Sequence, residues 1–318
     1  MNREMRNAVP ISAQQPGFFS RLRQQRLLYL MLLPTLIAVA IFSYKPLMYW
    51  IVAFKDYRPG QNMFACDWVG LKYFKEFFQN GQDAVYVIRN TLVINLSSLV
   101  INLFSAMVFS IVLNEIRMKK LRKVVQTVSI FPFFVSWVIT YSFCRVFFNV
   151  NSGLFNALLR QMGVIDKGLN ILGSPKYGWQ LIIGSNLWKS LGYNSVIFLS
   201  TIAGIDQEQY EAADIDGATR MQKILYITVP CLAGTLAVLL VMNSGWIFNS
   251  NFDQFYQFSN ATNMDRTDVF DTYVYRFGLK NGRLSYATAV GVFKSFVSLI
   301  VLLITNAANK KLTGNSIY

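Results

Sequence analysis

The stretch GIDQEQYEAADIDGATRMQKILYITVP (204–230) is polar and rich in charge, yet it separates two long apolar runs at 179–204 and 231–251. A run of about 20 apolar residues is long enough for a helix to cross a lipid bilayer. The stretch therefore has the place of a solvated connection between two membrane spans. This arrangement predicts a polytopic membrane protein that presents residues 205–230 to water.

The first half of this connection has the signals of a short helix. Asp206 can cap the helix, with Gln209 at the spacing of a capping box. Glu208 and Glu211 favour the positive N-terminal end of the helix dipole. Ala212 and Ala213 follow and leave a slim surface.

The second half has the signals of a turn and a second helix. Gly217 can adopt a positive φ for the turn, and we expect Ala218 to restart the helix. Pro230 should end that helix or open the next span. Small residues allow another protein's backbone to approach closely, and carboxylates can pair with its basic side chains. The stretch therefore predicts a docking surface.

Outward from this stretch, the 318-residue chain contains 53% apolar residues, gathered into long runs. We predict an all-α fold with six spans in one domain at 27–308, between a basic tail at 1–26 and a tail at 309–318. The spans are expected at 27–52, 86–113, 124–148, 179–204, 231–251 and 284–308. Prolines inside them can be accommodated where neighbouring helices bond to the freed carbonyls.

Basic residues set the expected orientation, because Lys and Arg are retained on the cytoplasmic side. The connection NEIRMKKLRK (114–123) carries five of them, and the N-terminal tail is basic too. We therefore expect both termini in the cytoplasm. The net charge of +14 is explained by this topology, and nucleic acid is not an expected partner. Short amphipathic helices at 69–78 and 153–164 suit either the outer membrane interface or an external protein.

Several kinds of chemistry are excluded by composition. The chain has no histidine, which removes the commonest general base and metal ligand, and it has no P-loop string for ATP. Three scattered cysteines do not suggest a zinc site or a disulfide framework. We therefore expect no catalytic residue, no metal site and no cofactor bound by this chain.

The string E-A-A, three residues, then Gly and a final I-x-x-P resembles the EAA loop of ABC importer permeases. The residues concerned are Glu211, Ala212, Ala213, Gly217, Ile227 and Pro230. The forms YEAADIDGAT and ITVP resemble the carbohydrate-uptake branch, especially permeases for oligosaccharides and polysaccharide fragments. RQQRLLYLMLLP, SNLWKSLGYNSVIFLSTIAGID and DTYVYRFGLKNGRLSYATAVGVFKSFVSLI are similar to that branch as well, so the resemblance covers nearly the whole chain.

The resemblance implies a type I importer permease of the bacterial cytoplasmic membrane, without catalysis of its own. Its loop would be a coupling helix on an ATPase subunit, which binds ATP and Mg, with Glu211 and Asp216 as polar anchors. The coupling residues would be Glu211, Ala212, Ala213, Asp214, Asp216, Gly217 and Ala218. The resemblance also implies a second, different permease chain, two ATPase subunits, an extracytoplasmic binding protein and a carbohydrate cargo.

Polar side chains inside spans are costly and usually face a bundle interior or a water-filled route. Amides bond sugar hydroxyls, and aromatic rings pack on sugar rings. Asn243, Trp246 and Asn249 have helical spacing and should share one face. Lys294 and Lys189 suit either an anionic sugar or a bond to helix carbonyls. The candidates for the substrate path are Asn186, Lys189, Tyr193, Asn194, Asn243, Trp246 and Asn249.

The competing interpretations belong to different classes. One is an ABC permease for a solute other than a sugar. Another is a self-sufficient secondary transporter or channel, but the expected spans contain no Asp or Glu for a proton relay. A membrane enzyme is disfavoured because no catalytic cluster lies at lipid depth.

Overall fold

The protein is described by a computed structural model that covers residues 25–79 and 81–313. The expected N-terminal tail lies almost entirely outside the described residues, as does 314–318 of the C-terminal tail. The chain divides into two units, residues 1–51 and 52–318. In the first unit, α2 (Arg26–Val39) continues through η1 (Ala40–Tyr44) into η2 (Lys45–Phe54), and residues 25–50 are all exposed. Such an apolar surface needs lipid or a partner to cover it.

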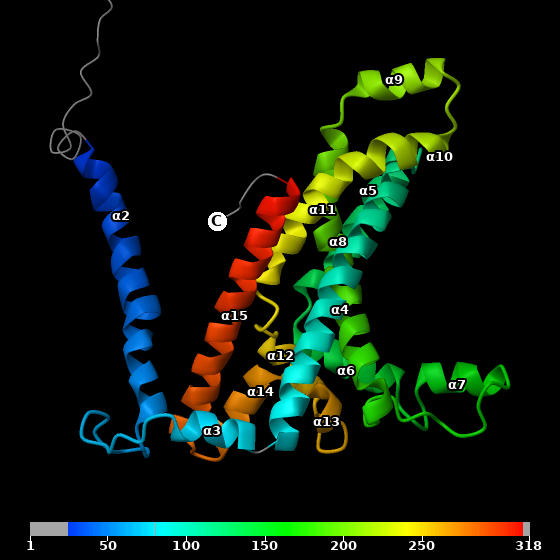
Figure 1. The fold of residues 1–318 in the computed structure, drawn as a ribbon. Helices are drawn as coiled ribbons and strands as arrows, with labels where there is room; N and C mark the ends of the chain where they lie inside the picture. The colour runs from blue at the N-terminus through cyan, green and yellow to red at the C-terminus, as the bar shows by residue number, and fades with distance from the viewer. Residues whose placement is uncertain (1–24, 80, 314–318) are drawn as a thin grey trace, which may run out of the picture. The chain divides into compact units, whose positions relative to one another are not determined.

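The second unit is a bundle of helices, and its described residues, 52–79 and 81–313, contain no strand apart from one isolated bridge. Figure 1 shows the long helices α4, α8, α11 and α15, with α9 and α10 at one end and α3, α7 and α13 at the other. The elements are α3 (Lys72–Gln79), α4 (Gly81–Asn114), α5 (Lys119–Ile130), η3 (Phe131–Phe134), α6 (Trp137–Phe147), α7 (Leu154–Gln161), η4 (Pro175–Tyr177), α8 (Gly178–Ala203), α9 (Gln207–Ile215), α10 (Arg220–Lys223), η5 (Ile224–Thr228), α11 (Val229–Ser244), α12 (Phe252–Phe258), α13 (Met264–Thr267), α14 (Phe270–Tyr275), η6 (Arg276–Lys280) and α15 (Leu284–Thr313).

The described helices include four that are long and apolar enough to span a membrane: Arg26–Phe54, Gly81–Asn114, Arg220–Ser244 and Leu284–Ala307. A fifth arises if the bent pair Lys119–Phe134 and Trp137–Phe147 is one span. α8 has almost the bounds expected for a span at 179–204, but it is not among these helices. The six-span count and the cytoplasmic termini stay predictions.

Two of the expected spans differ in form from the structure. The span expected at 124–148 bends by 103° after η3, where Ser136 caps the new helix. Pro132 contributes to this break because it cannot donate a backbone hydrogen bond. The span expected at 231–251 is displaced: the helix starts at Arg220, runs through Pro230 and ends at Ser244. Pro230 is tolerated because it lies in the first turn after the π-helical turn η5.

Packing within the second unit is tightest where helices lack side-chain bulk. A Cβ on Gly192 would collide with the Ser129 carbonyl, so α8 and α5 approach each other at backbone distance. Buried aromatic side chains fill the end of the bundle opposite the α9–α10 hairpin, where the hydroxyls of Tyr273 and Tyr286 are 2.7 Å apart. α3 lies largely within the amphipathic helix expected at 69–78, and it buries Tyr73 and Phe77 against this cluster.

Candidate coupling hairpin and substrate route

The hairpin formed by α9 and α10 is built by local hydrogen bonds. The Asp206 carboxylate accepts the Glu208 backbone N–H at 3.0 Å and caps α9. Gly217 turns the chain with φ of +73°, a conformation that costs other residues about 1–2 kcal/mol. The capping box lies at Thr219 and Gln222, not at the predicted pair Asp206 and Gln209.

The second helix of the hairpin begins later than expected. Ala218 does not restart the helix, because Thr219 is the cap and α10 begins at Arg220. The Thr219 N–H donates to the Gln222 side-chain oxygen at 2.7 Å, which fixes the cap outside the helix. The Ala218 N–H instead bonds to the carbonyl of Ala213 at 2.9 Å and closes the end of α9.

Three side-chain contacts fix the hairpin, one between its two helices and two to residues outside them. The Lys223 ammonium pairs with Asp214 at 2.6 Å, and the hydroxyls of Tyr210 and Thr228 lie 2.8 Å apart. Arg220 pairs with Glu115 beyond the end of α4 at 3.1 Å. Such exposed ion pairs stabilise by at most about 1 kcal/mol each, so they orient the hairpin more than they stabilise it. Asp214, expected to take part in coupling, is engaged within the hairpin.

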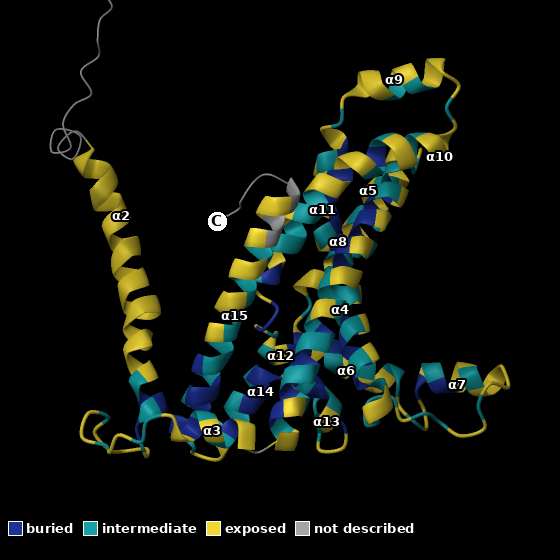
Figure 2. Ribbon diagram, viewed as in Figure 1, coloured by how far each residue is buried: buried dark blue, intermediate teal, exposed yellow. Residues whose placement is uncertain are grey.

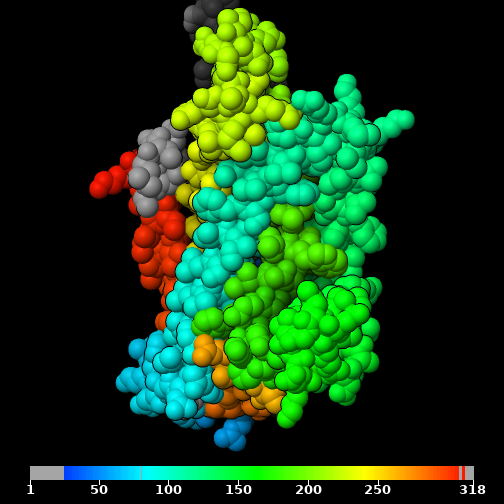
Figure 3. Space-filling model, turned by 90° about the vertical axis from the view of Figure 1, so that its right-hand side faces the viewer, coloured from blue at the N-terminus to red at the C-terminus, as the bar shows by residue number. Residues whose placement is uncertain are grey.

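The outer surface of the hairpin is available to a partner (Figures 2 and 3). Glu211, Ala212 and Asp216 are exposed, and neither carboxylate has a hydrogen bond or ion pair within the described part of the chain. Ala213 is half-buried. Ile215 is 88% exposed, so a large apolar side chain stands between carboxylates at the tip. The sequence signal for Ile215 was its position as a lone apolar residue between two aspartates.

Two of the candidate route residues bond inside the bundle. Asn102 donates to the Asn186 side-chain oxygen at 2.7 Å, and the Asn186 amide donates to Gln254 at 3.3 Å. The Lys189 ammonium donates to the carbonyl of Phe133 at 2.8 Å and to two neighbouring carbonyls, those of Pro132 and Val135. Lys189 thus satisfies the carbonyls that the broken span frees.

Tyr193, on the same side of α8, is still 47% exposed. Its ring stacks on Phe133, with centroids 3.9 Å apart and an interplanar angle of 5°. The neighbouring Asn194 is half-buried. An exposed, stacked aromatic face of this kind can pack against an apolar face of a sugar ring.

The segment 245–251 after α11 is not helical. The Asn249 N–H bonds to the Trp246 carbonyl at 2.8 Å, and the Trp246 N–H bonds to the Asn243 carbonyl at 3.0 Å, as in tight turns. Asn243, Trp246 and Asn249 therefore do not share one regular helix face as predicted. All three are nevertheless exposed, Trp246 by 67%.

This segment lies midway along α15. At its start, a Cβ on Gly245 would meet the Leu302 side chain, and at its end the Ser250 N–H donates to Asp271 at 2.9 Å. Asp271 pairs at 2.5 Å with Lys294, near the middle of the apolar span Leu284–Ala307. Non-helical backbone at membrane depth is tolerated only inside protein or along a water-filled cavity. Together with the exposed side chains, this position favours the cavity.

Lys294 is thus neutralised by the chain itself. Sequence reasoning missed Asp271 because it lies outside the expected spans, 23 positions from its partner. The available signal was the lysine: a cation at lipid depth requires an opposing charge or carbonyls. Neither Lys189 nor Lys294 remains free to hold an anionic sugar.

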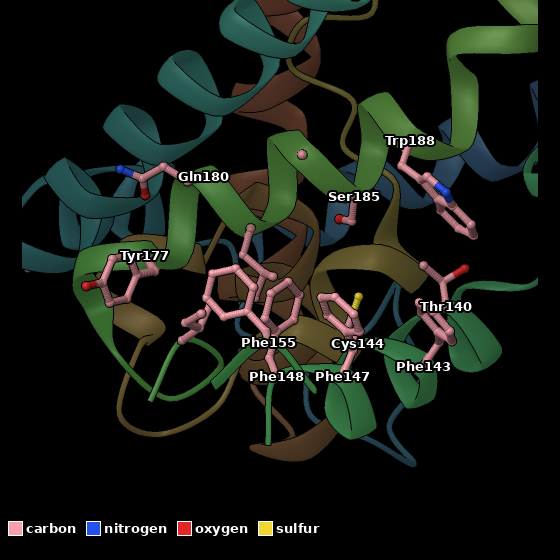
Figure 4. Close-up of a pocket in the computed structure, with 13 residues that line it drawn as sticks. Thr140, Phe143, Cys144, Phe147, Phe148, Phe155, Tyr177, Gln180, Ser185 and Trp188 are labelled. Carbon is pink, nitrogen blue, oxygen red and sulfur yellow. The ribbon is translucent and has the colours of Figure 1, made fainter. Parts of the chain in front are cut away.

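A large apolar pocket lies beside α8 (Figure 4). Its volume is about 440 Å³, and its walls come from one side of α8, including Trp188, and from phenylalanines in or next to α6 and α7. It contains no charged side chain and suits an apolar occupant better than a hydroxyl-rich one. Within the described residues, no group of three or more acidic, cysteine or histidine side chains could hold a metal ion.

The end of the bundle opposite the hairpin carries its own polar contacts. The Tyr73 hydroxyl donates to the Asp56 carboxylate at 2.6 Å, and this bond lowers the pKa of Asp56. Burial and the same bond raise the pKa of Tyr73 to about 12. Arg283 pairs with Glu76, which joins α3 to the start of α15.

The apolar helices define a polytopic helical membrane protein with a solvent-exposed hairpin at one end. A family model described as "Binding-protein-dependent transport system inner membrane component" matches residues 106–314, so the chain belongs to this family. It is therefore an inner-membrane component of a transport system.

Relatives cover nearly the whole chain. Protein LplB of Bacillus subtilis (strain 168) is 36% identical over 302 residues, which span 95% of this chain and 94% of LplB. The polygalacturonan/rhamnogalacturonan transport system permease protein YteP of the same organism is 37% identical over 298 residues, covering 94% and 92% of the two chains.

Solved structures are similar over the same extent. A chain of a bacterial ABC transporter involved in the import of the acidic polysaccharide alginate matches with a TM-score of 0.84 and 35% identity, covering 93% of this chain and 99% of that one. A bacterial alginate ABC transporter in complex with an alginate pentasaccharide-bound periplasmic protein matches with a TM-score of 0.86 and 34% identity, covering 94% and 99%. The fold is that of an ABC importer permease.

Proposed function

We propose that this chain is a permease subunit of an ATP-driven ABC importer, which moves an oligosaccharide into the cytoplasm by alternating access. The observation that carries this proposal is the exposed α9–α10 hairpin, where Glu211 and Asp216 have no side-chain partner among the described residues and lie near the apolar Ile215. A surface of this chemistry fits a cleft with basic and apolar walls. The occupant is an ATPase subunit, which binds ATP and Mg and carries out the hydrolysis.

The assembly needs further partners. A second permease of different sequence completes the pathway and covers apolar surface that the described residues leave exposed. Two ATPase subunits dock in the cytoplasm, and an extracytoplasmic binding protein delivers the cargo. The names of the relatives support this assembly, because one solved complex includes a periplasmic protein loaded with an alginate pentasaccharide.

The cargo proposal rests on the relatives and on the segment 245–251. YteP is named for polygalacturonan and rhamnogalacturonan, and both solved structures are alginate importers. An oligosaccharide with many hydroxyls suits the exposed Asn243, Trp246 and Asn249, which offer amides and one aromatic face. Tyr193 and Asn194 extend this surface along α8.

Docking is tested by co-purification of the ATPase with the tagged chain in detergent. Glu211→Ala and Ile215→Ser should each lower the ATPase recovered, because they remove an anchor and the apolar tip. Glu208→Ala is the matched control, since it removes an exposed carboxylate from the same helix. Equal recovery from all three variants would refute the docking role of this surface.

The cargo is tested in proteoliposomes that hold the complete complex. ATP hydrolysis is measured with the cognate binding protein and a panel of neutral and uronate oligosaccharides, alongside amino acids and peptides as non-sugar solutes. Stimulation by an oligosaccharide, lost in Trp246→Ala and Asn249→Ala, is the expected result. Stimulation by a non-sugar solute alone would refute the oligosaccharide cargo but would be consistent with an ABC importer permease.

A further inference from the structure

The segment 245–251 has an exposed side and an anchored side. Trp246 and Asn249 are exposed, whereas Ile247 and Phe248 are buried in the core cluster that also contains Tyr273 and Tyr286. A short non-helical segment cannot rely on helical hydrogen bonds to keep this alternation. Other parts of the chain must fix its backbone.

Two groups from outside the segment bond to this backbone. The Asn95 amide of α4 donates to the Ile247 carbonyl at 2.5 Å and to the Ser250 hydroxyl at 3.0 Å. The Asp271 carboxylate of α14 accepts the Ser250 N–H at 2.9 Å. An amide of α4 and a carboxylate of α14 thus hold Ile247 and Ser250, which precede and follow Asn249 in the sequence.

Lys294 completes the arrangement by holding Asp271. Its ammonium lies 2.5 Å from the Asp271 carboxylate, and the two side chains are only 12% and 25% exposed. An ion pair at this depth is costly to desolvate, and ionisable residues inside spans mark functional regions more often than they stabilise a fold. If this position required packing alone, a neutral side chain would have a lower desolvation cost.

We propose that Asn95, Asp271 and Lys294 form a clamp that positions the segment 245–251 so that Trp246 and Asn249 face the solute route. The clamp residues act through the backbone and do not need to touch the solute. This proposal rests on the proposed function, because the route is where those two side chains would meet the cargo.

The clamp is tested by the reactivity of a buried reporter. Ile247→Cys is introduced into a chain whose cysteines Cys66, Cys144 and Cys231 are replaced by serine, and the intact complex in membranes is treated with a charged methanethiosulfonate reagent. Because Ile247 is buried, the reagent reaches a cysteine at this position only when the segment opens locally. The extent of this opening therefore limits the rate of labelling. Asn95→Ala removes two bonds to the segment, whereas Asp271→Asn and Lys294→Met remove the ion pair that holds Asp271 in place. Each variant should speed labelling by about tenfold, which is the order of one hydrogen bond's contribution.

Matched variants separate the clamp from general loosening. Ser295→Ala, next to Lys294 on α15, removes only a bond to the Gly291 carbonyl of its own helix and should leave labelling unchanged. Lys294→Arg should label more slowly than Lys294→Met, because it keeps the charge. Labelling of the clamp variants at the rate of Ser295→Ala would overturn the proposal. If Lys294→Met does not assemble, the near-isosteric Asp271→Asn decides.

A second reporter distinguishes failure of the clamp from failure of the route. Asn249→Cys, in a chain that keeps Asn95, Asp271 and Lys294, should react readily with the same reagent if the side chain faces a water-filled route. An unreactive Cys at this position would refute the route and with it the clamp's purpose. A reactive one, together with unchanged labelling at Ile247→Cys, would refute the clamp alone.

Discussion

Replacement of Lys189 by Met should destabilise the chain at its broken span. The Lys189 ammonium donates to the carbonyls of Pro132 and Phe133 at 3.2 and 2.8 Å, and to that of Val135. It also lies 5.3 Å from the centre of the Trp137 ring. Met keeps much of the apolar stem and removes the charge, so the substitution isolates these polar contacts.

The magnitude follows from the number of contacts and their surroundings. Hydrogen bonds from a charged donor contribute about 1.5–3 kcal/mol each. Water can reach part of this site, because Lys189 is only half-buried, and water would replace some of the lost bonds. We therefore expect a loss of about 3 kcal/mol in total, near the cost of one fully desolvated contact.

The assay is thermal unfolding of the purified complex in one detergent, followed by the loss of its monodisperse elution. Lys189→Met should lower the apparent melting temperature by roughly 5 °C, given the small shift per kcal/mol in large proteins. Lys75→Met, an exposed lysine of α3, is the control. An equal melting temperature in the two variants would show that the bend does not depend on Lys189.

Three further substitutions test separate features. Gly192→Ala should cost about 2 kcal/mol, because its Cβ collides with the Ser129 carbonyl, whereas Gly184→Ala meets nothing within 4 Å; thermal unfolding compares the two. Gly217→Ala should weaken ATPase co-purification, because its φ of +73° strains alanine by about 1–2 kcal/mol; wild-type recovery would contradict this. Tyr73→Phe should reduce stability near neutral pH, with a difference from wild type that vanishes as acid protonates Asp56. The pKa of Asp56 is lowered in the fold, so its contribution to stability is present above the ordinary pKa of about 4 and is lost as the pH falls through the folded value. Thermal unfolding of both proteins from neutral to acidic pH measures this loss. A stability difference that stays constant with pH would refute the role of the Tyr73–Asp56 bond.

The features predictable from the sequence are those with local causes. The apolar run at 179–204 predicted α8 almost to the residue. The bounds of this helix follow from the composition of its own segment. The turn at Gly217 followed from the conformational freedom of glycine. The capping box was misplaced because Asp206 and Thr219 both head an x-x-Gln pattern, and the sequence does not reveal which side chain reaches back.

The features missed depend on contacts between distant segments. The common face of Asn243, Trp246 and Asn249 assumed a continuous helix, but α11 ends at Ser244, where Gly245 packs against Leu302. The run GWIFNSN (245–251), with its glycine, serine and two asparagines, carried a local warning of a break. No comparable signal tied Asp271 to Lys294, because the pairing depends on how α14 packs against α15.

The continuous helix Arg220–Ser244 gives the two candidate sites a physical connection. It begins inside the α9–α10 hairpin, where Glu211 and Ile215 form the proposed docking surface. It ends at Ser244, where the non-helical segment begins. Its 25 residues span about 37 Å at 1.5 Å per residue. A movement of α10 that keeps this helix intact reaches Ser244, next to Gly245, which packs against the Leu302 side chain. The clamp on Ser250 then resists from the other end. The proposed docking site and the proposed solute route are thus joined by one continuous helix, which is a physical path by which ATP hydrolysis in a partner would act on the segment that exposes Trp246 and Asn249.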